Sequence, residues 1–169
     1  MAIKLYKGDL PAGLDFGSSV AIDTETPGLN PRRDQLRLVQ LSPGARFDVA
    51  ALKHHLGVAT APVYCTKIAS KLTRTYTDRH GLKDLIKELL GIDLNKQQQS
   101  SDWGAHVLSD AQKQYAAQDV IYLHEVKARL DQMLAREGRT GLASACFDFV
   151  PVRADLDLAG WTEEDVFAH

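Results

Sequence analysis

Two acidic residues lie close together near the amino end of the chain, in the segment SSVAIDTE. Asp23 and Glu25 are two positions apart in a β-branched run, so a strand would project both side chains from one face. Carboxylates this close repel each other unless something positive lies between them. The pair could therefore hold a divalent cation such as Mg²⁺, which prefers oxygen ligands, or it could be a solvated pair at a strand end.

Two further aspartates and a tyrosine extend this pattern. Asp48 opens a predicted helix, where a carboxylate also interacts favourably with the helix dipole and could act simply as a cap. Asp119 lies four residues after Tyr115 in another predicted helix, and this spacing places both side chains on one face. An exposed tyrosine beside a solvated aspartate would show the same spacing.

The elements that must position these residues can be predicted from hydrophobic periodicity. Residues 18–25 and 35–41 are predicted strands, and the turn-forming segment TPGLNPRRD between them allows an antiparallel pair. A long helix is predicted between Ser109, which forms a capping-box pattern with Gln112, and Gly138. Three shorter helices are predicted over residues 47–57, 65–72 and 81–92.

Composition limits the function classes. A chain of 169 residues with 44% apolar and 25% charged residues is typical of one globular domain. No apolar run is long enough to span a membrane, and neither a secretory signal nor a metal-ligand spacing of the two cysteines is present, so we expect a cytoplasmic protein. A net charge of −2 excludes a generally basic nucleic-acid-binding protein. Residues 67–87 carry six basic against two acidic side chains, which indicates either a phosphate-binding surface or a solvated helix face.

Three segments together resemble the motifs of a known enzyme superfamily. AIDTETPGL resembles the first motif of the DEDD 3′–5′ exonucleases, FDVAAL the part of the second motif that contains its aspartate, and YAAQDV the third motif. Gln114 stands where the histidine version of the third motif has its histidine, whereas Tyr115 matches the tyrosine version. The chain therefore resembles the DEDDy branch, which includes the ribonuclease D-like enzymes.

This resemblance implies an α/β, ribonuclease H-like fold, with a mixed sheet flanked by helices. It implies that Asp23, Glu25, Asp48 and Asp119 hold two divalent cations, Mg²⁺ or Mn²⁺, and that Tyr115 orients or deprotonates the attacking water. Leu29 matches a leucine that separates the terminal bases in relatives. Three polar residues of one connection are candidate phosphate contacts or ordinary solvated loop residues: Lys96, Gln98 and Ser101.

A closer resemblance is to the nanoRNase C family, through CTKIASKLTRTYTDRHGLKDL, KQQQSSDW and RADLDLAGW. It implies a 3′–5′ exoribonuclease that degrades short single-stranded RNA, especially dinucleotides and possibly also DNA, to nucleoside 5′-monophosphates. It also implies a ring-shaped homo-octamer. We expect residues 1–150 to form the exonuclease domain and residues 151–169 to form a tail that belongs to the same domain and to the contacts between subunits.

One part of the pattern is shorter than in the relatives. They have a strand–helix–strand unit between the two segments that match LVQL and FD, whereas only SPGAR joins Leu41 to Phe47 here. Either the chain truly lacks this unit between residues 41 and 47, or the numbering runs continuously across residues that are absent from this sequence. Two other functions stay open: ribonuclease D-like trimming of longer RNA or DNA, and, if the second motif is truly shortened, a non-catalytic nucleic-acid-binding protein.

Overall fold

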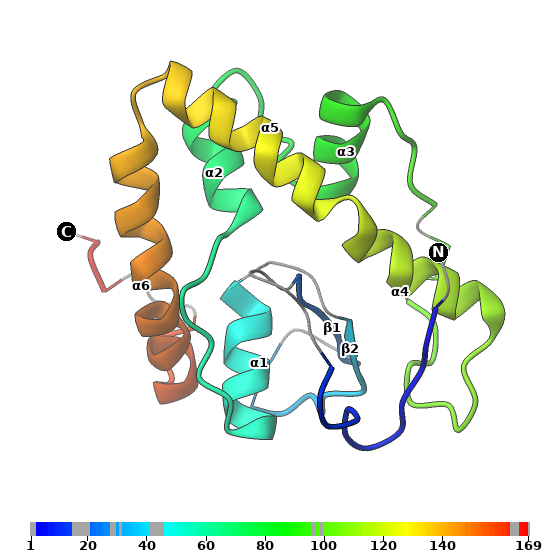
Figure 1. Cartoon of the computed structure of the whole chain (residues 1–169). Helices are drawn as coiled ribbons and strands as arrows, with labels where there is room; N and C mark the ends of the chain where they lie inside the picture. The colour runs from blue at the N-terminus through cyan, green and yellow to red at the C-terminus, as the bar shows by residue number, and fades with distance from the viewer. Residues whose placement is uncertain are drawn as a thin grey trace.

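The computed structural model describes residues 3–14, 21–27, 30, 32–40, 46–95, 97–98, 100–162 and 166–168. Helices dominate the described part of the chain, and they surround a small sheet (Figure 1). The elements in chain order are β1 (Asp23–Glu25), β2 (Leu38–Gln40), α1 (Arg46–Leu56), α2 (Thr66–Thr73), α3 (Leu82–Leu90), α4 (Asp110–Ile121), α5 (Leu123–Arg136) and α6 (Thr140–Ala159).

The described sheet is one antiparallel pair, as the turn-rich segment between the two predicted strands indicated. Asp23 lies opposite Gln40, and Glu25 lies opposite Leu38. Of the predicted mixed sheet, the described residues show only these two strands, and each is shorter than its predicted range. The segment predicted to have lost a strand–helix–strand unit centres on residues 41–45, which lie outside the described residues.

The predicted long helix over residues 109–138 is two helices, and this is the main local error of the prediction. α4 ends at Ile121 and α5 begins at Leu123. Between them, the backbone N–H of Tyr122 donates to the carbonyl of Val120 instead of the carbonyl one helical turn back. Apolar residues continue across the break at helical spacing, so periodicity could not reveal it. The predicted capping box of Ser109 and the end of the run at Gly138, whose φ is 65°, are confirmed.

α6 was not predicted as a helix. It is 20 residues long, contains Pro151 and is apolar on several sides, so its sequence lacks the one-sided pattern of a surface helix. Its middle packs against α1 through Val150 and Ala154, which form a buried cluster with Val49 and Ala50. None of the described helices is long and apolar enough to cross a membrane.

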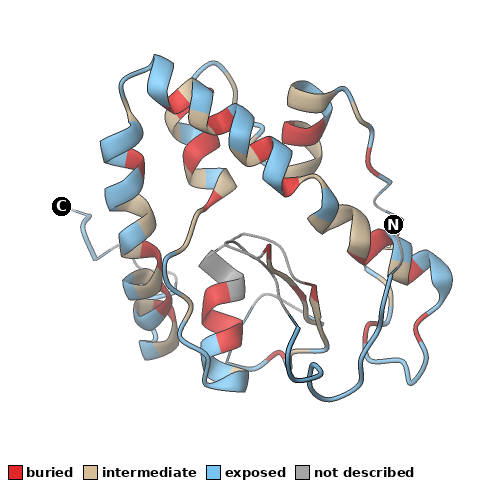
Figure 2. Cartoon of the chain, in the orientation of Figure 1, coloured by how far each residue is buried: buried red, intermediate tan, exposed pale blue. Residues whose placement is uncertain are grey.

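The largest buried cluster lies where α2, α3 and α5 meet, and Figure 2 shows the buried residues on the facing sides of these helices. Leu85 and Ile86 of α3 pack against Val126 and Leu130 of α5, and all four are fully buried. Each such side chain contributes about 1.5–3 kcal/mol through burial. This cluster holds α5 in place. It also helps to position α4, which directly precedes α5 in the chain and contacts β2.

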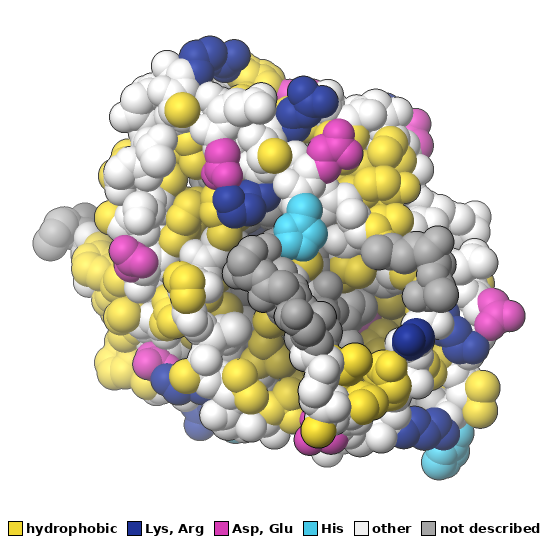
Figure 3. Space-filling model, in the orientation of Figure 1, with side chains coloured by type: hydrophobic (Ala, Val, Ile, Leu, Met, Phe, Trp, Pro, Cys, Tyr) yellow, Lys and Arg dark blue, Asp and Glu magenta, His cyan; other side chains and the backbone are white. Residues whose placement is uncertain are grey.

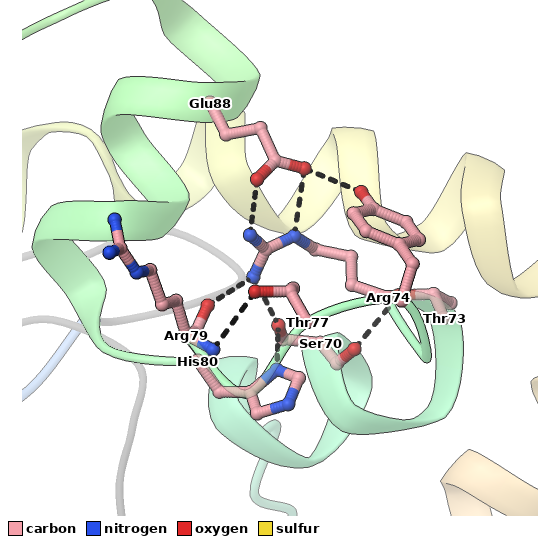
Figure 4. Close-up of polar contacts among 8 residues, drawn as sticks. Ser70, Thr73, Arg74, Thr77, Arg79, His80 and Glu88 are labelled. Atoms are coloured by element: carbon pink, nitrogen blue, oxygen red, sulfur yellow. Dashed lines mark hydrogen bonds and ion pairs between the residues drawn. The ribbon is translucent and has the colours of Figure 1, made fainter.

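A buried arginine joins the end of α2 to α3 (Figure 4). The guanidinium of Arg74 is fully buried; it donates to both carboxylate oxygens of Glu88, to Ser70 Oγ at 2.9 Å and to the carbonyl of Arg79 at 2.6 Å. Ser70 Oγ also contacts His80 Nδ1 at 2.8 Å. The hydrogen bonds from Arg74 hold the pKa of Glu88 below its usual value. The network therefore satisfies a charge that would otherwise be costly to bury.

We expect Arg74→Ala to lower the free energy of unfolding by about 2–3 kcal/mol, because it deletes a fully buried side chain and leaves Ser70 Oγ and the carbonyl of Arg79 without their donor, whereas the half-exposed Glu88 carboxylate can be hydrated. Arg79→Ala is the matched control: its side chain is exposed and only its backbone joins the network, so its effect should stay within about 0.5 kcal/mol. Urea unfolding followed by circular dichroism measures both. Equal stabilities of the two variants would show that the buried guanidinium is unimportant for the fold.

Candidate metal centre

Three carboxylates from two distant parts of the sequence meet at the sheet. Asp23, Glu25 and Asp119 each place an oxygen so that the three ligand atoms lie within 4.8 Å of one another, and all three side chains are half-buried. Strand alternation explains why Asp23 and Glu25 share a face of β1. Asp119 reaches them because α4 packs against β2, the partner strand of β1.

A glutamine of the neighbouring strand contacts the first two carboxylates. Gln40 lies opposite Asp23 in the sheet, and its Nε2 donates to Asp23 Oδ2 at 3.3 Å and to Glu25 Oε1 at 3.0 Å. Gln40 is 7% exposed. Sequence reasoning missed this residue; the signal that could have identified it is its strand position, which antiparallel pairing places beside Asp23.

Tyr115 lies one helical turn before Asp119 and is 8% exposed. Its ring packs beside that of Trp103, with 5.8 Å between the centroids, and against Leu108. Burial raises the pKa of the Tyr115 hydroxyl well above its ordinary value; the charge of Asp119 and a hydrogen bond with it raise the pKa further, as do the charges of Glu25 and Asp23. The hydroxyl therefore lies at the carboxylate cluster while the ring is held by the apolar core.

The start of α4 is tied to the preceding loop by Gln112. Its Nε2 donates to Ser101 Oγ at 3.2 Å and to the carbonyl of Asp102 at 3.0 Å, while its Oε1 accepts from the Ser109 backbone N–H at 2.9 Å. These bonds hold the loop that contains Trp103, whose ring supports Tyr115. Sequence reasoning identified Gln112 only as part of the cap, and it missed Trp103.

Of the other predicted site residues, the structure describes the side chains of Gln98 and Ser101 only. Asp48 lies in α1, but its side chain is outside the described part of the structure, as are Leu29 and Lys96. Gln98 is half-buried, and its carbonyl accepts from the backbone N–H of Ser101 at 3.0 Å. Ser101 accepts the hydrogen bond from Gln112, so one of its contacts is structural. The structure therefore brings together Asp23, Glu25, Tyr115 and Asp119.

The basic stretch over residues 67–87 is not one continuous positive surface. Arg74 is buried in its ion pair with Glu88, and Lys87 pairs with Asp93 at 2.9 Å. On the face in Figure 3 the Lys and Arg side chains lie in several small groups and do not form one continuous patch. The stretch therefore contributes less surface charge than its sequence indicated.

The donor set at the cluster fits a hard divalent cation. Three carboxylates supply oxygen ligands of the kind that Mg²⁺ and Mn²⁺ bind, and the cluster has neither the sulfur nor the imidazole ligands that zinc sites use. An ion among these groups would also relieve the repulsion among three negative charges.

Comparisons with known proteins agree with this chemistry. A family model described as "3′–5′ exonuclease" matches residues 42–135. A structure of Brucella melitensis NrnC is 53% identical, with a TM-score of 0.85 over 89% of this chain and 90% of that chain. Structures of the same protein with bound Mg²⁺ and bound to pGG match at TM-scores of 0.84. These matches confirm the ribonuclease H-like exonuclease fold.

Curated relatives match over shorter parts of their own length. Ribonuclease D from Gluconacetobacter diazotrophicus is 34% identical over 71% of this chain and 32% of its own length. DNA polymerase I from Aquifex aeolicus is 43% identical over 53% of this chain and 15% of its own length. The chain thus spans about a third or less of the curated relatives that it matches.

Proposed function

Because this chain belongs to the 3′–5′ exonuclease family, whose members are hydrolytic nucleases that use divalent metal ions, we propose that it degrades short oligonucleotides, dinucleotides above all, to nucleoside 5′-monophosphates. The observation that carries the substrate class is the match to Brucella melitensis NrnC bound to pGG, a dinucleotide, over nearly all of both chains. The substrate is single-stranded RNA, with DNA as a further candidate.

The described residues have distinct tasks in this reaction. Asp23, Glu25 and Asp119 hold two divalent ions, Mg²⁺ or Mn²⁺, with Asp48 of α1 as the fourth ligand that the motif resemblance implies. When bound, such ions activate a water molecule and stabilise the leaving 3′ oxygen. The Tyr115 hydroxyl orients the attacking water; taking the proton of that water would require the phenolate, which the raised pKa of Tyr115 disfavours in the metal-free protein. The packing of the tyrosine ring against Trp103 fixes where the hydroxyl lies.

Substrate contacts are proposed for the loop before α4 and for Leu29, which lies between β1 and β2. Leu29 separates the terminal bases, and Lys96, Gln98 and Ser101 contact phosphate. The hydrogen bond from Gln112 to Ser101 supports a fixed position for this loop beside α4. Ribonuclease D-like trimming of longer RNA is the second candidate, since the ribonuclease D relatives match 71% of this chain.

Hydrolysis of oligonucleotides of different length tests the proposed function. A dinucleotide, a heptamer and a 30-nucleotide RNA are each incubated with Mg²⁺ or Mn²⁺, and with EDTA as the control, and the products are separated by chromatography. The proposal predicts metal-dependent release of nucleoside 5′-monophosphates, with the highest kcat/KM on the dinucleotide. A higher kcat/KM on the 30-nucleotide RNA would favour the trimming function, and no release from any substrate would overturn the proposal.

We also propose that residues 151–169 belong to the exonuclease domain of residues 1–150 and form contacts between subunits of a homo-octamer. α6 runs across the boundary, and Ala154 is buried against α1. Arg153 donates to the carbonyl of Trp161 at 3.0 Å, which ties the segment after α6 to the helix. Trp161 and Phe167 nevertheless remain 43% and 62% exposed, and this apolar area is what a neighbouring subunit would cover.

The double variant Trp161→Ser/Phe167→Ser is expected to have a smaller molar mass than the parent in light scattering after size-exclusion chromatography, because it removes the apolar contact surface. Val107→Ser is the matched control, since Val107 is also apolar, is 78% exposed and lies far from α6 in the sequence. A double variant with the full parental mass would remove these two residues from the proposed interface.

A further inference from the structure

The side chain of Gln40 occupies a position between two negative charges. Its carboxamide nitrogen carries two N–H groups, and it lies 3.3 Å from Asp23 Oδ2 and 3.0 Å from Glu25 Oε1. One amide group can therefore donate to both carboxylates at once. The reverse orientation of the amide would direct the lone pairs of Oε1 at the same two anions, so the electrostatics of the pair fix which way the amide points.

The surroundings of Gln40 restrict its movement. The residue is 7% exposed and sits in β2, whose register places it directly opposite Asp23. Its Oε1 is buried and accepts no hydrogen bond from the described residues. A buried amide with an unsatisfied oxygen costs free energy, so the two bonds from Nε2 are the contacts that favour this side chain here.

We propose that Gln40 is a positioning residue for the metal centre: its amide holds Asp23 and Glu25 in the orientation that binds a divalent ion, before the ion arrives. This inference rests on the proposed function, since it takes these carboxylates as ligands. A carboxylate has two oxygens with about four lone-pair sites, so each can accept from Gln40 and still coordinate an ion. The two hydrogen bonds from Gln40 are therefore compatible with a bound ion.

Such positioning raises the affinity of the protein for the divalent ion, because the carboxylates are already ordered when the ion binds. Partners that hydrogen-bond to metal ligands typically change metal affinity by about 10–100-fold when they are mutated. Without Gln40, the repulsion between Asp23 and Glu25 would be offset by one donor fewer, and binding an ion would have to supply more of the ordering of the two carboxylates.

Mn²⁺ affinity of the metal-free protein tests this inference without relying on activity. Mn²⁺ is titrated into EDTA-treated and desalted protein, and the free ion is followed by electron paramagnetic resonance. In Gln40→Met, which keeps the length and burial of the side chain but has no donor, the dissociation constant should rise by about 10–100-fold. Val39→Ala is the matched control, because Val39 lies next in β2 and projects from the opposite face. Val39→Ala should lower the free energy of unfolding of the protein but leave its Mn²⁺ affinity unchanged.

Four results would decide against the inference or against the metal centre on which it rests. Parental Mn²⁺ affinity in a folded Gln40→Met variant would overturn it, as would an equal loss of affinity in Val39→Ala, which would indicate a general effect on the strand. If Gln40→Met does not fold, Gln40→Asn replaces it: its amide is one methylene too short to reach both carboxylates, and the same loss of affinity is expected, with parental affinity overturning the inference. A parent protein that binds no Mn²⁺ would overturn the proposed metal centre itself.

Discussion

Asp119→Asn is expected to lower kcat/KM for a dinucleotide by about 10³-fold at a fixed Mg²⁺ concentration. The substitution keeps the size of the side chain but removes one of three negative charges at the cluster. Metal ions contribute several kcal/mol of transition-state stabilisation, and a loss of about 4 kcal/mol corresponds to about 10³ in rate. Weaker metal binding should appear as a shift of the activity to higher Mg²⁺ concentrations.

Asp110→Asn is the matched control for this prediction. Asp110 is an aspartate of the same helix, but its side chain is 92% exposed and pairs with Lys113. Its replacement should leave both the hydrolysis rate and the metal titration close to those of the parent. An Asp119→Asn variant that hydrolyses the dinucleotide within a factor of about 10 of Asp110→Asn would contradict the assignment of Asp119 as a metal ligand.

Tyr115→Phe is expected to lower kcat by about 10²–10⁴-fold, the usual contribution of a positioned acid or base. Phenylalanine keeps the packing against Trp103, so the fold and the position of α4 should be preserved. Mn²⁺ affinity should change little, because the phenol is not proposed as a ligand. The measurement is single-turnover hydrolysis of a dinucleotide at saturating metal, with folding checked by circular dichroism.

Tyr122→Phe provides the comparison, since it removes a hydroxyl from a half-buried tyrosine that packs against the core of α3 and α5. It should hydrolyse the dinucleotide as fast as the parent. A Tyr115→Phe variant with that same rate would remove Tyr115 from the mechanism, and the chain would then lack the residue that distinguishes the tyrosine branch of the superfamily.

The carboxylates were predictable because local patterns and motif order place them. Strand alternation puts Asp23 and Glu25 on one face, and helical spacing pairs Tyr115 with Asp119. The turn-forming residues between the strands allowed an antiparallel pairing, and the structure has that pairing. That Asp119 then meets the strand carboxylates depends on how α4 packs against β2, and only the motif resemblance, not the spacing, could indicate it.

Sequence reasoning missed some features because they depend on tertiary contacts and others because their local pattern is uninformative. Gln40 belongs to the site only because the strand register places it opposite Asp23. Arg74 was counted among the basic residues of one surface stretch, but in the structure it is buried where α2 packs against α3. The break at Tyr122 interrupts hydrogen bonding without interrupting the apolar pattern. α6 was missed because it is apolar on several sides and contains Pro151. For Gln40 and Arg74 the deciding interaction joins residues that local periodicity does not relate, whereas the break at Tyr122 and α6 are local features that the apolar pattern does not reveal.

Anomalous X-ray scattering from Mn²⁺ bound in crystals of the parent protein tests the proposed metal centre most directly. The predicted result is two Mn²⁺ peaks in contact with the carboxylates of Asp23, Glu25 and Asp119, with the Asp48 side chain at one of them. Mn²⁺ peaks only elsewhere on the molecule, with these carboxylates unliganded at a saturating concentration of the ion, would contradict the metal centre and the hydrolytic mechanism built on it.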